Sequence, residues 1–407
     1  MKHLSLIHTA EQALSPIFSE IDAQVKKNLL KILDAFANHR VGVHHFSSVS
    51  GYGHNDLGRE TLDKVYAQVM GCESAAVRIG LVSGTHAIAC ALFGVLRPGD
   101  EMLAVAGAPY DTLEEVIGLR GEGQGSLKDF GVDYRQLELT AQGSIDWQAL
   151  STAVTARTKL VLIQRSCGYS WRQSLSIEEI EKIVHIVKKQ NKNTICFVDN
   201  CYGEFIETRE PTAVGADLMA GSLIKNPGGT IVTAGGYVAG KAELVEAAMC
   251  RLTAPGIGSE GGATLDQNRL LFQGLFLAPG MVGEAMKGGH LLSYVFDALG
   301  YEVNPLPFAK RRDIIQGIKL GSPEKLIAFC KAIQSCSPIG SYIDPIPART
   351  PGYESSVVMA GGTFIDGSTS EFSADGPLRE PYIVFCQGGT HWTHIAIAIE
   401  RVLQVFG

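Results

Sequence analysis

Two stretches, residues 194–205 (TICFVDNCYGEF) and residues 221–229 (GSLIKNPGG), decide the fold of this chain. The first is typical of a buried strand that ends in Asp199, where a carboxylate is costly without a partner. A cationic ring nitrogen would supply that partner. The alternative is that Asp199 only caps the loop that follows the strand. The second delivers Lys225 between an apolar run and a glycine-rich turn. Desolvation there is expected to lower the pKa of the Lys225 amine. The alternative is that Lys225 is an isolated surface lysine in a loop.

Outward from these stretches, short β-rich runs alternate with helical stretches from Ala75 to about Gly240. The alternation predicts an α/β fold, with a mostly parallel sheet and helices on both faces. The runs ADLMAGS and TIVTAGGYVAG flank Lys225 with no helix between them, so at least one strand there is expected to be antiparallel. The runs are 75–81, 101–107, 132–139, 159–164 and 194–199 for strands, with helices at 85–96, 110–119, 146–155 and 176–190.

The flanks predict three parts. Residues 1–55 form an N-terminal helical arm and loop, residues 56–290 a large domain, and residues 291–407 a smaller α+β C-terminal domain. A helix from about Thr264 to Leu299, broken near Pro279, is expected to lead into the last part.

Composition favours small-molecule chemistry. The chain has 407 residues, a formal net charge of -7 and no massed basic stripe, so neither nucleic acid nor a membrane is an expected partner. It shows no long apolar run and no secretory signal, which predicts a cytoplasmic protein. Nine cysteines without a CxxC pair favour reduced thiols over disulfides or a zinc site.

A third segment, SGTH at 83–86, is a polar turn that opens a helix. Free backbone N–H groups and the positive end of the helix dipole make such a turn an anion cup, although a plain Ser or Thr N-cap gives the same pattern. Together the cup, Asp199 and Lys225 provide the groups that a phosphorylated pyridine aldehyde requires. Asp199 would keep the ring nitrogen protonated, so that the ring accepts electrons from the substrate Cα.

These segments also carry a family resemblance. With Tyr110 in GAPYDTLEE, their order resembles the Cys/Met-metabolism branch of fold type I pyridoxal-phosphate enzymes. GYGHNDLGRETLDKVYAQVMG, VSGTHAI, FVDNCYGEF, GSLIKNPGGTI and SADGPLREPYIVFCQGG are more closely similar to the family labelled methionine gamma-lyase-like or aluminium-resistance protein. The resemblance implies the pyridoxal-phosphate-dependent transferase fold of the aspartate-aminotransferase type, and pyridoxal 5'-phosphate as cofactor.

The resemblance also implies roles at the reacting centre. Lys225 would be the Schiff-base lysine and the proton shuttle, and Asp199 would hold the pyridinium. Tyr110 would stack on the cofactor ring and protonate a departing thiol.

Further residues would bind the cofactor phosphate. The cup from Ser83 through Gly84 to Thr85, together with the Ser222 hydroxyl, would surround it. Tyr52 matches a tyrosine that reaches the phosphate of a neighbouring subunit, which implies a homo-oligomer with a shared active site.

The chain departs from the better-known lyases at two places. Ile224 stands where they carry Thr, and QRSCGYS (164–170) replaces their Ser-Asn-Pro turn. A bidentate arginine is expected for the substrate carboxylate. We choose Arg379 for this role, and Arg165 and Arg349 are the other candidates. The alternative interpretation is that such an arginine forms an interdomain salt bridge.

Two histidine pairs raise the question of a metal. His44 and His45 are adjacent and are expected to point apart, while His391 and His394 form H-x-x-H. Neither pair is joined by a cluster of carboxylates or thiols, so no metal is predicted.

The implied function is a lyase that releases a thiol, a 2-keto acid and ammonia from methionine, cystathionine, cysteine or a related amino acid. An aminotransferase or a carbon–carbon lyase on the same fold is one alternative. A non-enzymatic metal-tolerance protein that retains the fold is another.

Overall fold

The larger of two sheets has seven strands. The computed structural model describes residues 2–121, 124–350, 353 and 355–406. The strand order is β1-β7-β6-β5-β4-β2-β3; β7 is antiparallel to β1 and β6, and the other neighbours are parallel. Both predictions for this sheet are therefore confirmed. The strands are β1 (Ser74–Arg78), β2 (Glu101–Ala104), β3 (Asp133–Gln136), β4 (Thr158–Gln164), β5 (Ile195–Asp199), β6 (Leu218–Ser222) and β7 (Gly236–Gly240).

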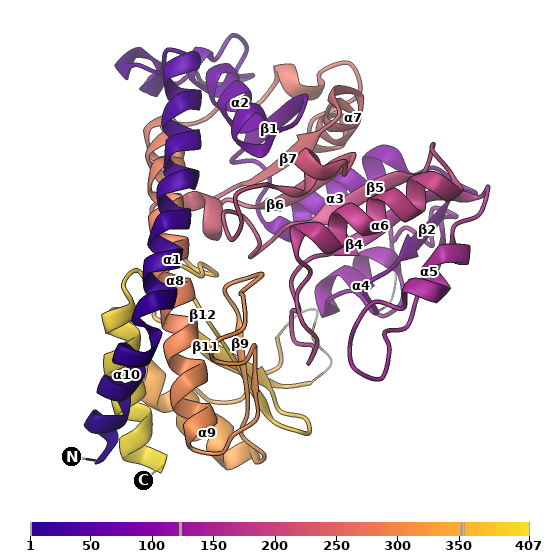
Figure 1. The fold of residues 1–407 in the computed structure, drawn as a ribbon. Coiled ribbons are helices and arrows are strands. Elements are labelled where there is room, and N and C mark those ends of the chain that lie inside the picture. The colour runs from indigo at the N-terminus through magenta and orange to yellow at the C-terminus, as the bar shows by residue number, and fades with distance from the viewer. Residues whose placement is uncertain (1, 122–123, 351–352, 354, 407) are drawn as a thin grey trace.

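Helices cover both faces of this sheet (Figure 1). Successive residues of a strand point to opposite faces, so Cys196 and Val198 of β5 join one apolar cluster while Ile195 and Phe197 join the other. Residues of α2, α5 and α6 pack in the first cluster, and residues of α3, α4 and α7 in the second. The helices are α2 (Leu57–Met70), α3 (Gly84–Val95), α4 (Asp111–Ile117), α5 (Trp147–Ala153), α6 (Ile177–Gln190) and α7 (Ala242–Leu252).

The second sheet is smaller and antiparallel throughout, in the order β10-β11-β12-β9-β8. A separate apolar cluster joins it to α9 and α10, which confirms the α+β prediction for the C-terminal part. Its elements are β8 (Val303–Asn304), β9 (Gln316–Lys319), α9 (Pro323–Gln334), β10 (Val357–Ala360), β11 (Ser373–Pro377), β12 (Ile383–Gln387) and α10 (Trp392–Phe406).

Two long helices, α1 (Lys2–Asn38) and α8 (Asn268–Ala298), run side by side along both parts (Figure 1). The predicted break near Pro279 is wrong, because α8 continues through that residue. An internal proline costs about 3 kcal/mol, and the apolar face that α8 buries along its length outweighs this cost. The boundaries proposed at 55/56 and 290/291 stay predictions, and the second lies inside α8.

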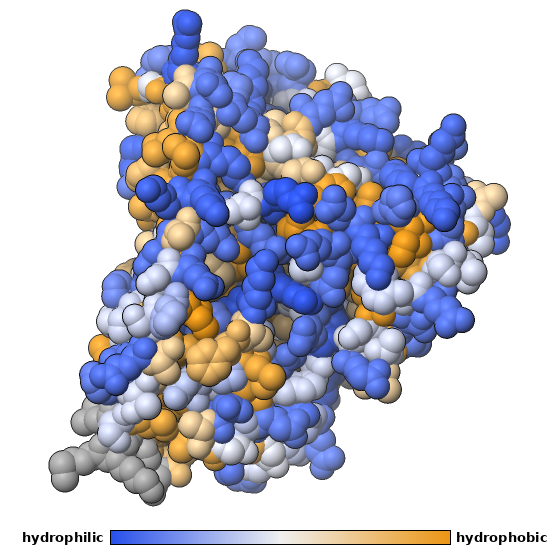
Figure 2. All heavy atoms as spheres, viewed as in Figure 1, coloured by the Kyte–Doolittle hydropathy of each residue, from blue (hydrophilic) through white to orange (hydrophobic). Residues whose placement is uncertain are grey.

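Figure 2 shows hydrophilic residues over most of the visible face, with smaller groups of apolar residues between them. Within the described parts of the chain, no helix combines the length and the apolar character needed to cross a lipid bilayer.

Candidate active site

A cavity of about 1020 Å³ lies beyond the carboxyl ends of three neighbouring strands of the large sheet. Gln164, Asp199 and Ser222, the last residues of β4, β5 and β6, all line it. Ligands of open α/β sheets bind at this edge. The small sheet closes the other side, so both parts of the molecule build the cavity.

The start of α3 forms the cup at one end of the cavity. Ser83 caps the helix, since its Oγ accepts the His86 N–H at 3.0 Å, and the amides of Gly84 and Thr85 lie in the first turn, where N–H groups lack an intrahelical acceptor. A Cβ on Gly84 would lie 3.0 Å from Cys201 Sγ and 3.2 Å from Ser222 Cβ, so a side chain there would force these neighbours to move by a few tenths of an ångström.

Ser222 supplies the observation that tests the cup for an anion. Its side chain is buried, and its Oγ has no hydrogen-bond partner among the described residues. A buried hydroxyl without a partner is rare and requires an explanation. A phosphate group held by the N-terminal turn of α3 would accept this hydrogen bond, so the residues present fit the phosphate of the predicted cofactor.

Asp199 ends β5 with only 5% of its surface exposed. One carboxylate oxygen accepts the Cys201 N–H at 3.1 Å, so the residue does cap the following loop. It also lines the cavity, where burial raises the pKa of its carboxyl group against the opposing effects of that N–H, Lys225 and Arg172. A cationic ring nitrogen in the cavity would relieve the cost of burying this charge.

Lys225 follows β6 and faces the same cavity, so it is not an isolated surface lysine. Its Nζ lies 3.9 Å from the centroid of the Tyr202 ring. Burial by itself lowers the pKa of the amine, but Tyr202, Cys201 and Asp199 raise it further than burial lowers it. The prediction of a lowered pKa for Lys225 is therefore wrong when only groups of the protein act on the amine. The reason is that acidic groups at the strand ends lie around it.

The turn after Lys225 depends on glycine. Gly229 has φ +52°, and a Cβ there would lie 2.2 Å from the carbonyl oxygen of Gly274 in α8. A side chain at this position would push the turn away from α8 and displace the lysine.

Tyr110 joins the cup to the sheet. Its hydroxyl lies 3.0 Å from Thr85 Oγ1, and its backbone N–H donates to Gln164 Oε1 at 2.9 Å. Burial and the nearby Asp199 raise the pKa of the phenol well above its ordinary value. Tyr110 is thus a neutral hydroxyl that is able to donate a proton within the cavity.

Several cavity residues were missed from the sequence. They include Tyr202 beside Lys225, and Tyr169, Tyr353 and Asp375 on the side of the small sheet. The replaced segment 164–170 also lines the cavity, as does Ile224. The sequence did carry a signal for Asp375, because this carboxylate lies within an otherwise uncharged strand. It carried no such signal for the tyrosines.

Tyr52 lies outside the set of residues that line this cavity. It is 78% exposed, and its ring stacks on His54 with 5.7 Å between the ring centroids. Its predicted contact with a neighbouring subunit stays a prediction.

The three arginines have different surroundings. Arg379 lies in the turn between β11 and β12 and lines the cavity. Arg165 is fully buried, and its Nη1 donates to Asn200 Oδ1 at 2.9 Å and to the Gly203 carbonyl at 2.8 Å, so its guanidinium is used within the fold. Arg349 is exposed and outside the lining. The carboxylate role of Arg379 stays a prediction.

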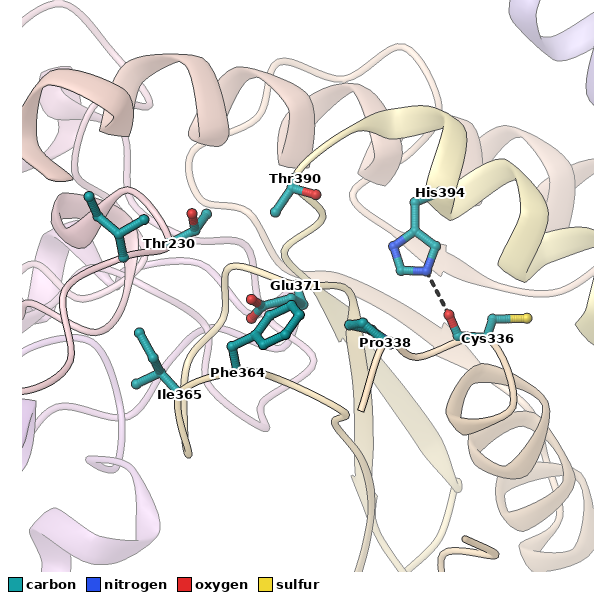
Figure 3. A pocket seen from close by; sticks show the side chains of 9 residues that line it. Thr230, Cys336, Pro338, Phe364, Ile365, Glu371, Thr390 and His394 are labelled. Atoms are coloured by element: carbon teal, nitrogen blue, oxygen red, sulfur yellow. Dashed lines mark hydrogen bonds between the residues drawn. The ribbon is translucent and has the colours of Figure 1, made fainter. Parts of the chain in front are cut away.

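A second cavity, of about 630 Å³, lies beside the start of α10 (Figure 3). His394 points toward the loop after α9, where its Nε2 donates to the Cys336 carbonyl at 2.8 Å. His391 lies 3.8 Å from Glu284. In the described part of the chain, no three His, Cys, Asp or Glu residues are grouped to hold a metal ion.

The arrangement of His44 and His45 differs from the prediction. The rings of His44 and His45 do not point apart, since their centroids are 4.0 Å apart. A short 3-10 helix over Val43–Phe46 sets their backbone conformation and brings the rings together.

Comparisons with known proteins identify the family of this chain. The family model for methionine gamma-lyase matches residues 3–406. A Bacillus subtilis protein of uncharacterized function, YnbB, is 50% identical over 390 residues, which are 96% of this chain and 93% of that protein.

Solved structures are similar over the whole chain. The structure of a carbon–sulfur lyase involved in aluminium resistance from Clostridium novyi is 48% identical, covers 100% of this chain and 96% of its own, and has a TM-score of 0.95. A Listeria monocytogenes protein, provisionally named a cystathionine beta-lyase involved in aluminium resistance, is 46% identical with a TM-score of 0.96, over 98% of this chain and 99% of its own. The chain therefore belongs to the methionine gamma-lyase family of carbon–sulfur lyases, whose cofactor is pyridoxal 5'-phosphate.

Proposed function

We propose that this enzyme eliminates a sulfur leaving group from a small amino acid and releases a thiol, a 2-keto acid and ammonia. One observation carries the proposal. Lys225, Asp199 and Tyr110 face a single cavity that also holds the unpartnered Ser222 hydroxyl. The cavity thus combines an anion cup with three further groups. Lys225 is suited to carry a proton, Asp199 to pair with a cationic ring, and Tyr110 to donate a hydrogen bond as a neutral hydroxyl.

The bound cofactor supplies an electron sink for the negative charge that develops at the substrate Cα. Lys225 would hold the aldehyde end of the cofactor and, once the substrate amine has displaced it there, would move the proton at Cα. Asp199 would keep the proton on the ring nitrogen, because its carboxylate is stabilised by the cationic form of the ring. Tyr110 donates its hydroxyl proton to the departing sulfur, and the cup with Ser222 orients the phosphate end.

The experiment is product analysis with the reconstituted enzyme and L-methionine, L-cystathionine or L-cysteine. We expect 2-keto acid, ammonia and thiol in equal amounts, without any added keto acid. Keto acid that forms only with an added keto-acid acceptor would identify an aminotransferase, and an aldehyde released from a β-hydroxy amino acid such as L-threonine would identify a carbon–carbon lyase. No product from any of the three would contradict the proposal and favour the metal-tolerance alternative.

Ser222→Ala is expected to weaken cofactor binding while leaving folding nearly unchanged. A hydrogen bond to a charged group contributes about 1.5–3 kcal/mol, which corresponds to a rise of about ten- to hundredfold in the Kd for pyridoxal phosphate. The hydroxyl has no hydrogen-bond partner to lose among the residues that the structure describes, so the urea midpoint of the cofactor-free protein is expected to stay constant. Titration with the cofactor measures the Kd.

Ser83→Ala is the matched control. It removes the cap on α3 and is expected to lower the free energy of unfolding by about 1 kcal/mol. An unchanged Kd in Ser222→Ala, or a loss of stability as large as in the control, would show that the Ser222 hydroxyl belongs to the fold and not to the phosphate.

A further inference from the structure

One face of the small sheet forms the wall of the cavity opposite the cup. Ser373 and Asp375 alternate along β11 and therefore point to the same face. Met359 of β10 and Phe385 of β12 lie directly beside Asp375, and Gln387 lies beside Ser373. All five residues line the cavity.

Asp375 is half-buried with its Oδ1 atom enclosed, and no cation forms an ion pair with it among the described residues. Oδ2 accepts the Gln387 side-chain N–H at 3.3 Å, and Oδ1 has no hydrogen-bond partner among those residues. Burial raises the pKa of its carboxyl group to about 6, against the opposing effects of the Tyr169 hydroxyl and Lys225. Enclosing a charged oxygen without a partner costs free energy, and a ligand of opposite charge would offset that cost.

Aromatic residues line the same cavity as the carboxylate, and one of them, Phe385, lies beside Asp375 in the sheet. The ring of Tyr169 lies 5.3 Å from that of Phe385 and 5.7 Å from that of Tyr353, measured between centroids. A carboxylate that shares a cavity with aromatic rings is suited to an ammonium group, which gains an ion pair and cation–π contacts together. An anionic or a purely apolar ligand group would gain neither.

We propose that Asp375 is a specificity-determining residue that binds a second ammonium group of the substrate, beyond the sulfur atom. The inference rests on the proposed elimination and names its substrate class, namely thioether amino acids with an ammonium group on the leaving half. The other cationic groups of the cavity have their own roles. Asp199 serves the ring nitrogen and the cofactor aldehyde takes up the substrate α-amine, while Arg379 is assigned to the substrate carboxylate and Lys225 acts as a neutral amine when it takes the Cα proton. A methyl thioether leaves Asp375 Oδ1 enclosed and unpaired, which disfavours methionine.

The test compares substrates that differ in one ammonium group. L-Cystathionine carries it, S-(3-carboxypropyl)-L-cysteine lacks it on the homocysteine half, and S-(2-carboxyethyl)-L-homocysteine lacks it on the cysteine half. We expect kcat/KM for cystathionine to exceed that of the analogue with the same bound half at least about tenfold, in line with one charged hydrogen bond. Asp375→Asn should lower kcat/KM for cystathionine by a similar factor and leave the analogue within about twofold.

Asp366→Asn is the matched control, because Asp366 is an exposed carboxylate that lines the same cavity. It should leave both kcat/KM values unchanged. Equal kcat/KM for cystathionine and its analogue, or an equal fall for both in Asp375→Asn, overturns the inference while elimination stands. No product from any of the substrates overturns the proposed elimination itself.

Discussion

Lys225→Ala is expected to abolish nearly all elimination activity, with kcat/KM reduced by about 10²–10⁴-fold or more, the contribution of one positioned proton carrier. The variant loses both the group that holds the cofactor aldehyde and the group that moves the Cα proton. Turnover by wild type and variant is measured at equal cofactor occupancy. After borohydride reduction, mass spectrometry should find the cofactor on the peptide that contains Lys225 in the wild type alone.

Lys287→Ala is the control for loss of a buried lysine. Lys287 pairs with Asp22 at 2.6 Å and with Glu284 at 2.9 Å, away from the residues that line the catalytic cavity. Its loss should lower stability and spare kcat/KM. Added methylamine should restore part of the activity of Lys225→Ala, because a free amine is able to carry the same proton. More than a tenth of wild-type activity without such an amine would contradict the assignment of Lys225.

Asp199→Asn is expected to lower kcat/KM by about 10²–10⁴-fold. Removal of one partner from a buried charge pair costs about 3–5 kcal/mol, and each 1.36 kcal/mol corresponds to tenfold in rate. The Asn oxygen still accepts the Cys201 N–H, so the loop after β5 keeps its cap. Steady-state kinetics and urea unfolding together separate the catalytic effect from the effect on folding.

Asp217→Asn supplies the comparison. Asp217 is buried just before β6, where it pairs with Lys188 at 2.6 Å and Lys241 at 2.7 Å outside the cavity. This variant should lose stability and keep its kcat/KM. Pyridoxal phosphate methylated on the ring nitrogen carries a permanent charge and should rescue Asp199→Asn. Failure of the rescue in a folded, cofactor-loaded variant would mean that Asp199 acts other than through the ring proton.

Local signals in the sequence were sufficient for the large sheet. The run TICFVD, the Ser83 cap and the glycines after Lys225 each act through neighbours a few residues away, so their structures follow from local propensity. The order of the cup, Asp199 and Lys225 then follows from the rule that parallel strands end at one edge. The same reasoning placed Ser222 at the cavity, whereas Tyr110 was implied by the family resemblance.

The sequence by itself thus determined the fold and, with the family resemblance, the cofactor, and it placed Asp199 and Lys225 at one edge of the large sheet. Tertiary structure alone decided that α8 continues through Pro279, that the surroundings of Lys225 raise its pKa, and that Arg165 is used within the fold. It also brought Asp375 from the small sheet to face Lys225 across the cavity. These features depend on burial and charge shared between segments far apart in the chain, and no local pattern encodes such long-range contacts.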